Sequence, residues 1–378
     1  MTNFDILCLS PCSWGERVGR LQHLMRVAAR RHRVLVLEQA ANLTEDAPVV
    51  AAPVHDGSGI RVFRPADRSW RLGGSRVRTS LRTILGSADR RHLLLWIDSP
   101  RMLGLVPPDG ASTLICDLHD PMQAATASLS RADLLLTSGS SAYQASRHLH
   151  PRTYLFPHAV DVEHFSRART RHREPPDQAM IPGPRVGFWG TVNERIDFEL
   201  LDALARRMPH VHFVMLGPVE RSGRERVVSR PNVHWLGSRS YVDLPDYISG
   251  WSAALLPFAR NDATRFMSPP QIPEFLAAGR TVVSTSVRDV LHPYGASGLV
   301  KVADTVDGIA AALDTALRGQ SAEWLTTVDR YLRALSWEST WEGIEHLVNR
   351  VHQQRAEAPA LEGRMSQLAA LTPASVMH

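Results

Sequence analysis

Residues 261–285 read NDATRFMSPPQIPEFLAAGRTVVST, and this stretch decides how the fold is interpreted. Ser268 and two prolines precede a short apolar segment of helical type, which is followed by a glycine and a strand-like run at 281–284. Serine is a favourable helix N-cap and proline fits the first helical turn, so we expect a helix capped by Ser268. Its free backbone N–H groups would attract phosphate. Glu274, a turn further on, could accept hydrogen bonds from ribose hydroxyls, although an ordinary capped helix with a surface glutamate has the same local pattern.

The sequence around this stretch alternates between apolar runs and helical stretches. The strand-like runs of this half are residues 185–189, 211–216, 253–257, 281–284 and 299–302. Short buried strands that alternate with helices predict a parallel sheet. In such sheets ligands bind beyond the carboxyl ends of the strands. We therefore expect Gly190 and Thr191, Gly217 and Pro218, and the loop after Phe258 to converge on one crevice.

The first half of the chain shows the same pattern. A strand-like run at 4–9 is followed by apolar residues at helical spacing and by a second run at 33–38, which is a βαβ unit. Further runs of this type are residues 92–98, 112–117 and 132–137. The sequence thus predicts an α/β protein with two facing Rossmann-like, doubly wound domains.

Proline and polar residues mark the expected domain boundaries. We expect a first domain at 1–166 and a polar interdomain linker at 167–184. The second domain is expected at 185–335. A helix at 336–354 would cross back to the first domain, and 355–378 would form a flexible tail.

Length and composition are those of an ordinary globular protein with two cores. The chain has 378 residues, of which 44% are apolar and 21% charged. No stretch approaches the roughly 20 continuous apolar residues that cross a bilayer, and the first residues lack the pattern of a signal peptide. We therefore expect a cytoplasmic protein.

A basic segment lies at residues 67–92. It contains Arg68, Arg71, Arg76, Arg78, Arg82, Arg90 and Arg91, and its acidic residues are Asp67 and Asp89. Apolar residues at helical spacing make an amphipathic basic helix plausible. Such a helix could be simply solvated, or it could bring the protein to anionic lipid at the inner face of a membrane or to a phosphorylated acceptor.

Several well-known binding motifs are absent. The loop after the first strand, residues 13–19, reads SWGERVG and lacks the glycine pattern of dinucleotide sites, which argues against nicotinamide and flavin chemistry. A Walker loop, a Gly-x-Ser-x-Gly motif and a metal-binding Asp-x-Asp are also absent. We therefore expect no cofactor, no metal and no nucleic-acid partner.

Several segments, in order, resemble the retaining GT-B glycosyltransferases. Residues 156–165 (FPHAVDVEHF) are similar to the Pro-x-Gly-Val-Asp-x-x-x-Phe segment that ends their first domain. Residues 185–195 (RVGFWGTVNER) resemble the first strand and loop of their second domain, and 232–245 (NVHWLGSRSYVDLP) resemble a later strand with its Tyr-x-x-Leu-Pro turn. Residues 261–285 are similar to their nucleotide-sugar signature. The chain thus resembles bacterial glycosyl transferases group 1, the glycogen-synthase-like branch.

The resemblance implies a metal-independent hexosyltransferase that retains anomeric configuration. Its co-substrate would be a nucleotide-diphosphate sugar bound by the second domain. Its acceptor, on the side of the first domain, would be a cell-envelope glycan, a lipid-linked precursor or a small molecule. This implies a role in polysaccharide biosynthesis. The donor-binding residues expected from the resemblance are Gly190, Thr191, Arg195, Gly217, Thr264, Arg265, Ser268, Pro269, Pro270 and Glu274.

The chain departs from the family pattern at charged positions. Phe266 stands where many relatives carry the first of two glutamates, and Gln271 replaces a common lysine. The arginine-lysine pair that neutralises the donor diphosphate has no clear counterpart after Gly190. We expect Arg195 and Arg265 to neutralise the diphosphate in place of this pair. Arg195 is also placed among the catalytic residues.

Polar residues follow the strand-like run at 112–117. His119 resembles a histidine that approaches the donor sugar in relatives, where it is a candidate for taking the acceptor proton. A histidine that only caps the strand end is the structural alternative, and Asp120 is an alternative base. The acceptor-side candidates, chosen by their position on the first loop and helix, are Trp14, Gly15, Arg17 and Arg20.

Two other functions fit the same architecture. A nucleotide-sugar epimerase also uses two facing domains, but it needs several acid/base groups, of which only His119 and Asp120 are evident. A non-catalytic nucleotide-sugar-binding partner of another transferase would tolerate Phe266 and the missing cation pair.

Overall fold

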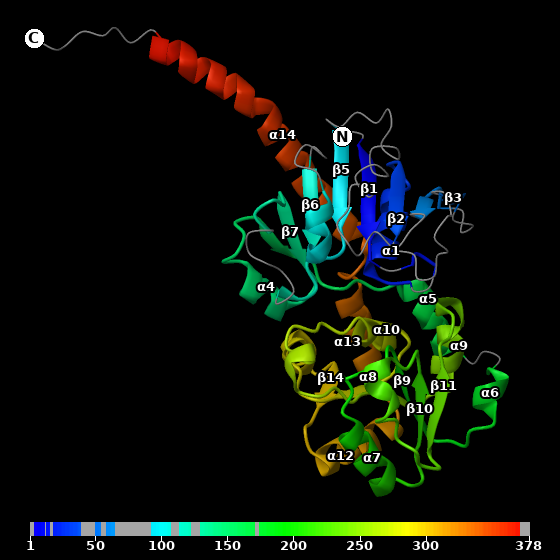
Figure 1. Cartoon of the computed structure of the whole chain (residues 1–378). Coiled ribbons are helices and arrows are strands. Elements are labelled where there is room, and N and C mark those ends of the chain that lie inside the picture. The colour runs from blue at the N-terminus through cyan, green and yellow to red at the C-terminus, as the bar shows by residue number, and fades with distance from the viewer. Residues whose placement is uncertain are drawn as a thin grey trace, which may run out of the picture.

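The computed structural model describes residues 4–11, 13–15, 18–38, 50–53, 58–64, 92–106, 113–121, 129–170 and 174–370, with side chains up to Arg355 in the last helix. Two α/β domains lie end to end in Figure 1, the first in blue to teal and the second in green to yellow. Each contains its own sheet, so the predicted pair of doubly wound domains is confirmed.

The first domain is built on an eight-stranded sheet in the order β3-β4-β2-β1-β5-β6-β7-β8. All neighbouring strands are parallel except the edge pair β3 and β4. The strands are β1 (Asp5–Ser10), β2 (Val34–Glu38), β3 (Val50–Pro53), β4 (Arg61–Arg64), β5 (Leu93–Ile97), β6 (Thr113–Asp117), β7 (Leu134–Thr137) and β8 (Thr153–Leu155). The helices are α1 (Arg20–Ala28) and α4 (Ser140–Ser146), and Pro100–Leu105 is 3-10 helical.

The second domain is built on a six-stranded parallel sheet in the order β11-β10-β9-β12-β13-β14. Its strands are β9 (Arg185–Trp189), β10 (His212–Leu216), β11 (Val233–Gly237), β12 (Ala253–Leu256), β13 (Val282–Ser284) and β14 (Val300–Val302). Its helices are α7 (Phe198–Arg207), α8 (Arg221–Arg224), α9 (Leu244–Ser249), α10 (Gln271–Ala277), α11 (Arg288–Val290), α12 (Val306–Leu317) and α13 (Ala322–Leu332). The strand order reverses between β9 and β12, which is where such sheets bind ligands.

Short irregular helices complete the second domain. Tyr241–Asp243 and Asp262–Thr264 are 3-10 helical, and Leu291–Gly295 is a π-helical turn. The strands of both sheets form because their apolar runs are buried on both faces, as in β2, β5 and β12.

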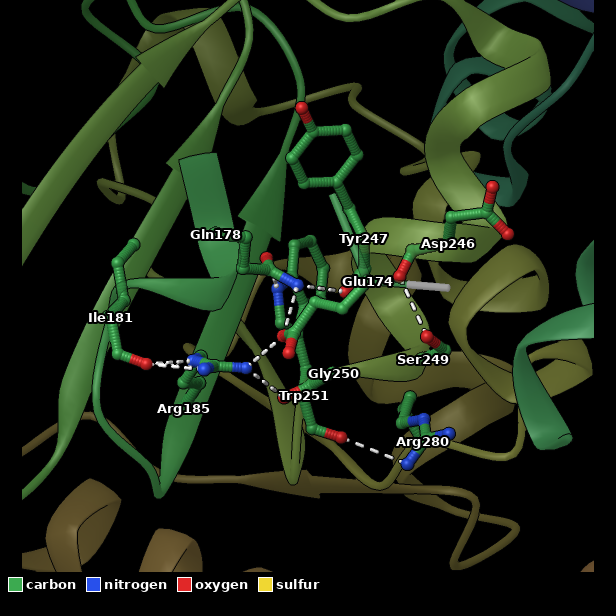
Figure 2. Close-up of polar contacts among 10 residues, drawn as sticks. All are labelled: Glu174, Gln178, Ile181, Arg185, Asp246, Tyr247, Ser249, Gly250, Trp251 and Arg280. Carbon is green, nitrogen blue, oxygen red and sulfur yellow. Dashed lines mark hydrogen bonds and ion pairs between the residues drawn. The ribbon is translucent and has the colours of Figure 1, made fainter. Parts of the chain in front are cut away.

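The connection between the domains is packed onto the second domain. It contains α5 (Val162–Ser166), a 3-10 turn at Arg167–Arg169 and α6 (Pro176–Ala179). Figure 2 shows Gln178 of α6 between two partners: its Nε2 donates to the Tyr247 carbonyl at 2.8 Å, and its Oε1 accepts from Trp251 Nε1 at 2.8 Å. Arg280 joins the same region by donating to the Trp251 carbonyl at 2.9 Å. The residues expected as a linker are thus held in place by buried hydrogen bonds.

The last helix, α14 (Trp337–Ala370), returns to the first domain. Its apolar side chains pack in the core there beside α1 and the sheet, and they are Trp337, Trp341, Ile344, Leu347, Val348 and Val351. The helix runs to Ala370, beyond residue 354, where the sequence pattern predicted its end. Residues 356–370 are rich in alanine, glutamate and leucine, which are strong helix formers. This part of α14 extends away from both domains in Figure 1.

Within the described ranges, no helix combines the length and the apolar character that crossing a membrane requires. The predicted basic segment at 67–92 lies, except for His92, outside the described residues. Cys8 and Cys116 are both buried free thiols.

Candidate functional site

The loops that follow β9, β10 and β12 meet at one edge of the second sheet. Gly190 and Gly217 both have positive φ, at 145° and 136°. A Cβ atom on Gly217 would lie 1.8 Å from the Gly190 carbonyl oxygen, so only glycine allows this approach. The loop after β12 joins them because Ala259 N donates to the Arg195 carbonyl at 2.8 Å. The structure thus brings together the loops that the sequence placed in one crevice.

The loop after β12 is held in shape by Thr264. Its hydroxyl donates to the Ala259 carbonyl at 2.6 Å and accepts from the Asn261 backbone N at 3.2 Å. Only 3% of Thr264 is exposed. This residue of the predicted donor set therefore shapes the loop, whereas Arg265 is exposed and lies over the Phe266 ring at 5.3 Å from its centroid.

The prediction that Ser268 caps the following helix is wrong. The helix α10 begins at Gln271, Pro270 occupies the N-cap position, and no side chain caps it. An N-cap side chain accepts from the backbone N–H two or three residues further on, and Pro270 removes one of these two donors from Ser268. Ser268 instead lies against the first domain, because its Cβ is 3.0 Å from the place where a Cβ on Gly139 would stand.

Glu274 lies inside this region and not on the surface. Only 8% of it is exposed, and burial raises the pKa of its carboxyl well above the usual range. Its Oε2 atom has no hydrogen-bond partner among the described residues. A buried, unpaired carboxylate is costly to the free protein, so this position is better explained by a ligand that supplies hydrogen bonds.

Further unpaired polar atoms surround Glu274. Tyr241 Oη and Gln271 Oε1 are also buried and lack partners in the described part of the chain, and the Trp189 side chain lies close enough to Glu274 to lower its pKa against the effect of burial. Gln271 shares a face of α10 with Glu274, and its Nε2 lies 2.7 Å from where a Cβ of Gly190 would stand. Burial raises the pKa of Tyr241, and the charge of Glu274 adds to this effect. The cluster offers donors and an acceptor to a polar ligand.

A second polar cluster lies at the carboxyl ends of β5 and β6 in the first domain. Arg20 Nε donates to Asp117 Oδ2 at 2.8 Å, and Arg20 Nη1 donates to the Phe156 carbonyl at 2.9 Å. Both members of this ion pair are buried. His119 Nε2 lies 3.1 Å from Asp98 Oδ1, and 45% of the histidine side chain is exposed.

The charges of this cluster shift the pKa of its members. Burial lowers the pKa of His119, but the hydrogen bond to Asp98 and the charge of Asp117 outweigh it, so the pKa is raised. Burial raises the pKa of Asp98, with His119 acting against it. Burial lowers the pKa of His158 well below its usual value, and the charges of Arg20 and His119 add to this. A proton can therefore be held on His119 while His158 stays neutral.

Asp98, Asp117 and His119 could in principle hold a metal ion together. Their candidate ligand atoms all lie within 4.8 Å of one another. Arg20 already supplies a positive charge to Asp117, and His119 bonds to Asp98. The trio thus forms two neighbouring pairs, and Asp117 Oδ1 has no hydrogen-bond partner among the described residues.

The acceptor-side candidates occupy different environments. Trp14 is 4% exposed, lies in the first core, and donates its backbone N–H to Glu38. A ring so buried has no face for an acceptor, which corrects that prediction. Gly15 is exposed, Arg17 lies outside the described residues, and Arg20 is committed to Asp117.

The remaining predicted residues lie near the two clusters. Asp120 is half-buried directly after His119, and Arg195 is exposed on the loop after β9. Pro269 and Pro270 lead into α10, and Thr191 is half-buried next to Gly190. Asp98 was not among the predicted site residues. It directly follows the apolar run at 93–97, just as His119 follows the run at 112–117, so the same signal could have identified it.

Two cavities lie along the boundary between the domains. One of about 860 Å³ is lined by α1, α5 and the start of α14. The other, of about 650 Å³, lies between α4 and the loops after β12 and β13. Glu274 and His119 line neither of them. The site at Glu274 is therefore defined by its unpaired polar atoms and not by these cavities.

Comparison with known proteins gives a family match within the second domain. Residues 183–319 match the family model described as Glycosyl transferases group 1. The protein TuaH of Bacillus subtilis, whose name describes a glycosyltransferase of teichuronic acid biosynthesis, is 27% identical over 134 residues. That match covers 34% of this chain and 33% of TuaH, so the chain matches about a third of the length of this relative.

Solved structures resemble nearly the whole chain. Sucrose-phosphate synthase from Thermosynechococcus elongatus matches with a TM-score of 0.68 and 15% identity, over 93% of this chain and 100% of its own. HepE from Anabaena, solved with UDP and glucose, matches with a TM-score of 0.59 and 16% identity, over 95% and 100%. These likenesses show that the two domains adopt the GT-B fold.

Proposed function

We propose that the protein is a glycosyltransferase that moves a hexose from a nucleotide-diphosphate sugar to an acceptor, without a metal and with retention of anomeric configuration. The observation that carries the proposal is Glu274, a buried carboxylate with an unpaired oxygen in the segment that matches the family model. Ribose hydroxyls are donors that would satisfy it. The likeness to GT-B structures supports the same assignment.

The leaving diphosphate needs positive charge. Arg195 and Arg265 lie on the loops after β9 and β12, both are exposed, and neither forms an ion pair within the described ranges. Guanidinium groups bind phosphate oxygens in a bidentate manner. We assign them to the diphosphate, where they replace the cation pair that the sequence lacks.

His119 is our candidate for the group that receives the acceptor proton. Its Nε2 faces Asp98, which leaves Nδ1 to accept a proton. In the reaction the bond from the anomeric carbon to the phosphate breaks, and a bond to the acceptor oxygen forms. The acceptor proton goes to His119 Nδ1, or to an oxygen of the leaving phosphate in a front-face attack. Asp98 is then a positioning residue.

The acceptor is proposed to be a cell-envelope glycan or its lipid-linked precursor. The name of TuaH supports an envelope polysaccharide. We propose that the protein works at the inner face of the membrane and is held there by the basic segment at 67–92. A small-molecule acceptor would need no such attachment.

Nucleotide titration with a Glu274 variant tests the donor site. We expect one of uridine, guanosine, adenosine and thymidine diphosphate to bind the wild type clearly and to raise its melting temperature. Glu274→Gln should lose about tenfold or more of this affinity, because ribose hydroxyls are left with a poorer acceptor. The variant should also melt at a higher temperature without ligand, since it no longer buries a carboxylate whose pKa is raised.

The matched control is Glu323→Gln, which changes an exposed glutamate of the same domain. Unchanged nucleotide affinity in Glu274→Gln would remove Glu274 from the site. Incubation of the wild type with radiolabelled donor then separates the three functions considered: transfer or slow hydrolysis supports the proposal, whereas an epimerised donor or binding without turnover contradicts it.

A further inference from the structure

The cavity of about 650 Å³ lies next to the proposed donor loop and is bounded by both domains. Helix α4 of the first domain contributes Ser141 and Gln144, and the second domain contributes Arg260, Arg265 and Arg288. The volume lies within the range of roughly 300–1,000 Å³ that small-molecule sites usually have.

The lining of this cavity is positively charged. Asp262 is the acidic residue among its described lining, against the arginines at 260, 265 and 288. Arg260 forms an ion pair with Asp304, with 3.4 Å between Arg260 Nη1 and Asp304 Oδ2. For Arg265 and Arg288, no ion pair is formed within the part of the chain that the structure describes.

The nearby carboxylates are engaged elsewhere. Asp289 follows Arg288 in sequence, but it accepts hydrogen bonds from Ser140 and Ser141. Asp304 accepts from the Ser286 backbone N at 2.9 Å and from its hydroxyl at 2.6 Å. Arg260 is thus paired with Asp304, whereas the charges of Arg265 and Arg288 have no ion-pair partner among the described residues.

The cavity also continues the donor loop. Residues 264–266 form one of its walls and lead directly into α10, which carries Glu274. Phe266 presents an uncharged ring there, and Arg265 is stacked over it. A sugar held by this loop would place its substituents beside arginines and an aromatic ring, with no carboxylate at Phe266 to repel a negative charge.

We propose that this cavity binds the negatively charged group of an anionic sugar, either the carboxylate of a uronic acid or the phosphate of a sugar phosphate. The inference rests on the proposed function and narrows its substrate class. A carboxylate or phosphate would make charge-assisted hydrogen bonds to Arg288, beside Arg265, which the proposed function assigns to the diphosphate.

Titration of the full chain with glucuronate, glucose 6-phosphate and glucose tests the inference. We expect the two anionic probes, or one of them, to bind about tenfold more tightly than glucose at low salt, and Arg288→Gln to remove about that factor. The stronger anionic probe identifies the charged group. Arg318→Gln, at the C-cap of α12 and outside the lining of this cavity, should leave binding unchanged.

Equal affinity for glucose and both anionic probes, or an unchanged affinity in Arg288→Gln, would overturn the inference. Nucleoside diphosphate binding is measured on the same samples. If the nucleotide binds but the affinity for the sugar probes does not depend on their charge, this inference alone fails. If no nucleotide binds, the proposed function fails.

Discussion

Asp289 of the second domain caps the first turn of α4 in the first domain through Ser141. The Ser141 backbone N donates to Asp289 Oδ1 at 2.9 Å, and the Ser141 hydroxyl donates to Oδ2 at 2.8 Å. The Ser140 hydroxyl adds a third bond at 2.7 Å, and Asp289 is only 3% exposed. A carboxylate at a helix start is favoured by the free N–H groups there. These contacts tie the two domains together beside the proposed sugar site.

Asp289→Ala should loosen the contact between the domains. The variant removes the acceptor of three hydrogen bonds, and bonds to a charged group contribute about 1.5–3 kcal/mol each when buried. We expect a larger radius of gyration in small-angle X-ray scattering, with an unchanged far-UV circular dichroism spectrum. Gly139→Ala should have the same effect, because its Cβ would lie 2.2 Å from Asp289 Oδ2.

Asp304→Ala is the matched control for this change. Asp304 bonds to Ser286 and Arg260, which both belong to the second domain. Its loss should leave the scattering curve unaltered. Identical scattering from wild type and Asp289→Ala would show that Asp289 does not hold the domains together.

Gln178→Ala should destabilise the second domain. Gln178 is fully buried, and its loss leaves the Trp251 indole N–H and the Tyr247 carbonyl without this partner (Figure 2). An unsatisfied buried polar group costs about 1–3 kcal/mol, so the melting temperature should fall by several degrees. Gln353→Ala, an exposed position on α14, is the control. A melting temperature equal to wild type would assign the connection no part in stability.

The strands could be predicted from sequence where both faces are buried. The runs that became β1, β2, β5 and β7 are almost continuously apolar, and so are most strands of the second sheet. Three strands were missed. β8 has only three residues and is partly exposed, and β3 and β4 form an antiparallel pair at the edge of an otherwise parallel sheet. Edge strands lack the strong apolar pattern that burial on both faces imposes.

The sequence offered candidate residues one at a time, but it could not predict how they pair. His119 and Asp98 meet because β5 and β6 are neighbours in the sheet, and strand order is not contained in local sequence. Asp289 and Ser141 lie in different domains and are 148 positions apart. Ser268 was predicted as a cap from its residue type, whereas the helix begins at Gln271 with Pro270 at the N-cap position. Trp14 was placed by position in a loop, whereas its size favours burial.

The pair formed by Asp98 and His119 should set a pH limit on activity. The pKa of His119 is raised, so the histidine is neutral and able to act as a base only at a pH above this raised pKa. Activity should therefore fall as the pH drops through it. Asp98→Asn removes the charge and should move this acid limb to lower pH. The pH profile of kcat for wild type and variant measures the shift, and Asp133→Asn, which bonds to the Leu114 backbone N and Arg355, is the control. Coincident acid limbs would rule out His119 as the base.

The same pair predicts how stability depends on pH. A histidine whose pKa is higher in the folded state stabilises the protein fully below its unfolded pKa, and this contribution is lost as the pH rises through the folded value. The free energy of unfolding should therefore decrease across that window in the wild type. His119→Gln should flatten the curve there. A wild-type curve with no slope in this window would contradict the raised pKa.

The basic segment at 67–92 should attach the protein loosely to anionic membranes. It contains Arg68, Arg71, Arg76, Arg78, Arg82, Arg90 and Arg91 against Asp67 and Asp89. Each arginine near an anionic surface contributes about 1 kcal/mol, so several together give reversible, salt-sensitive binding.

We expect the wild type to sediment with phosphatidylserine-containing liposomes at low salt and to be released at high salt. Replacing Arg76, Arg78 and Arg82 by glutamine should weaken sedimentation and leave nucleotide binding intact. The same change at Arg206, Arg224 and Arg318, exposed arginines of the second domain, should have little effect. Failure of the wild type to sediment at low salt would refute the attachment and favour an acceptor free in solution.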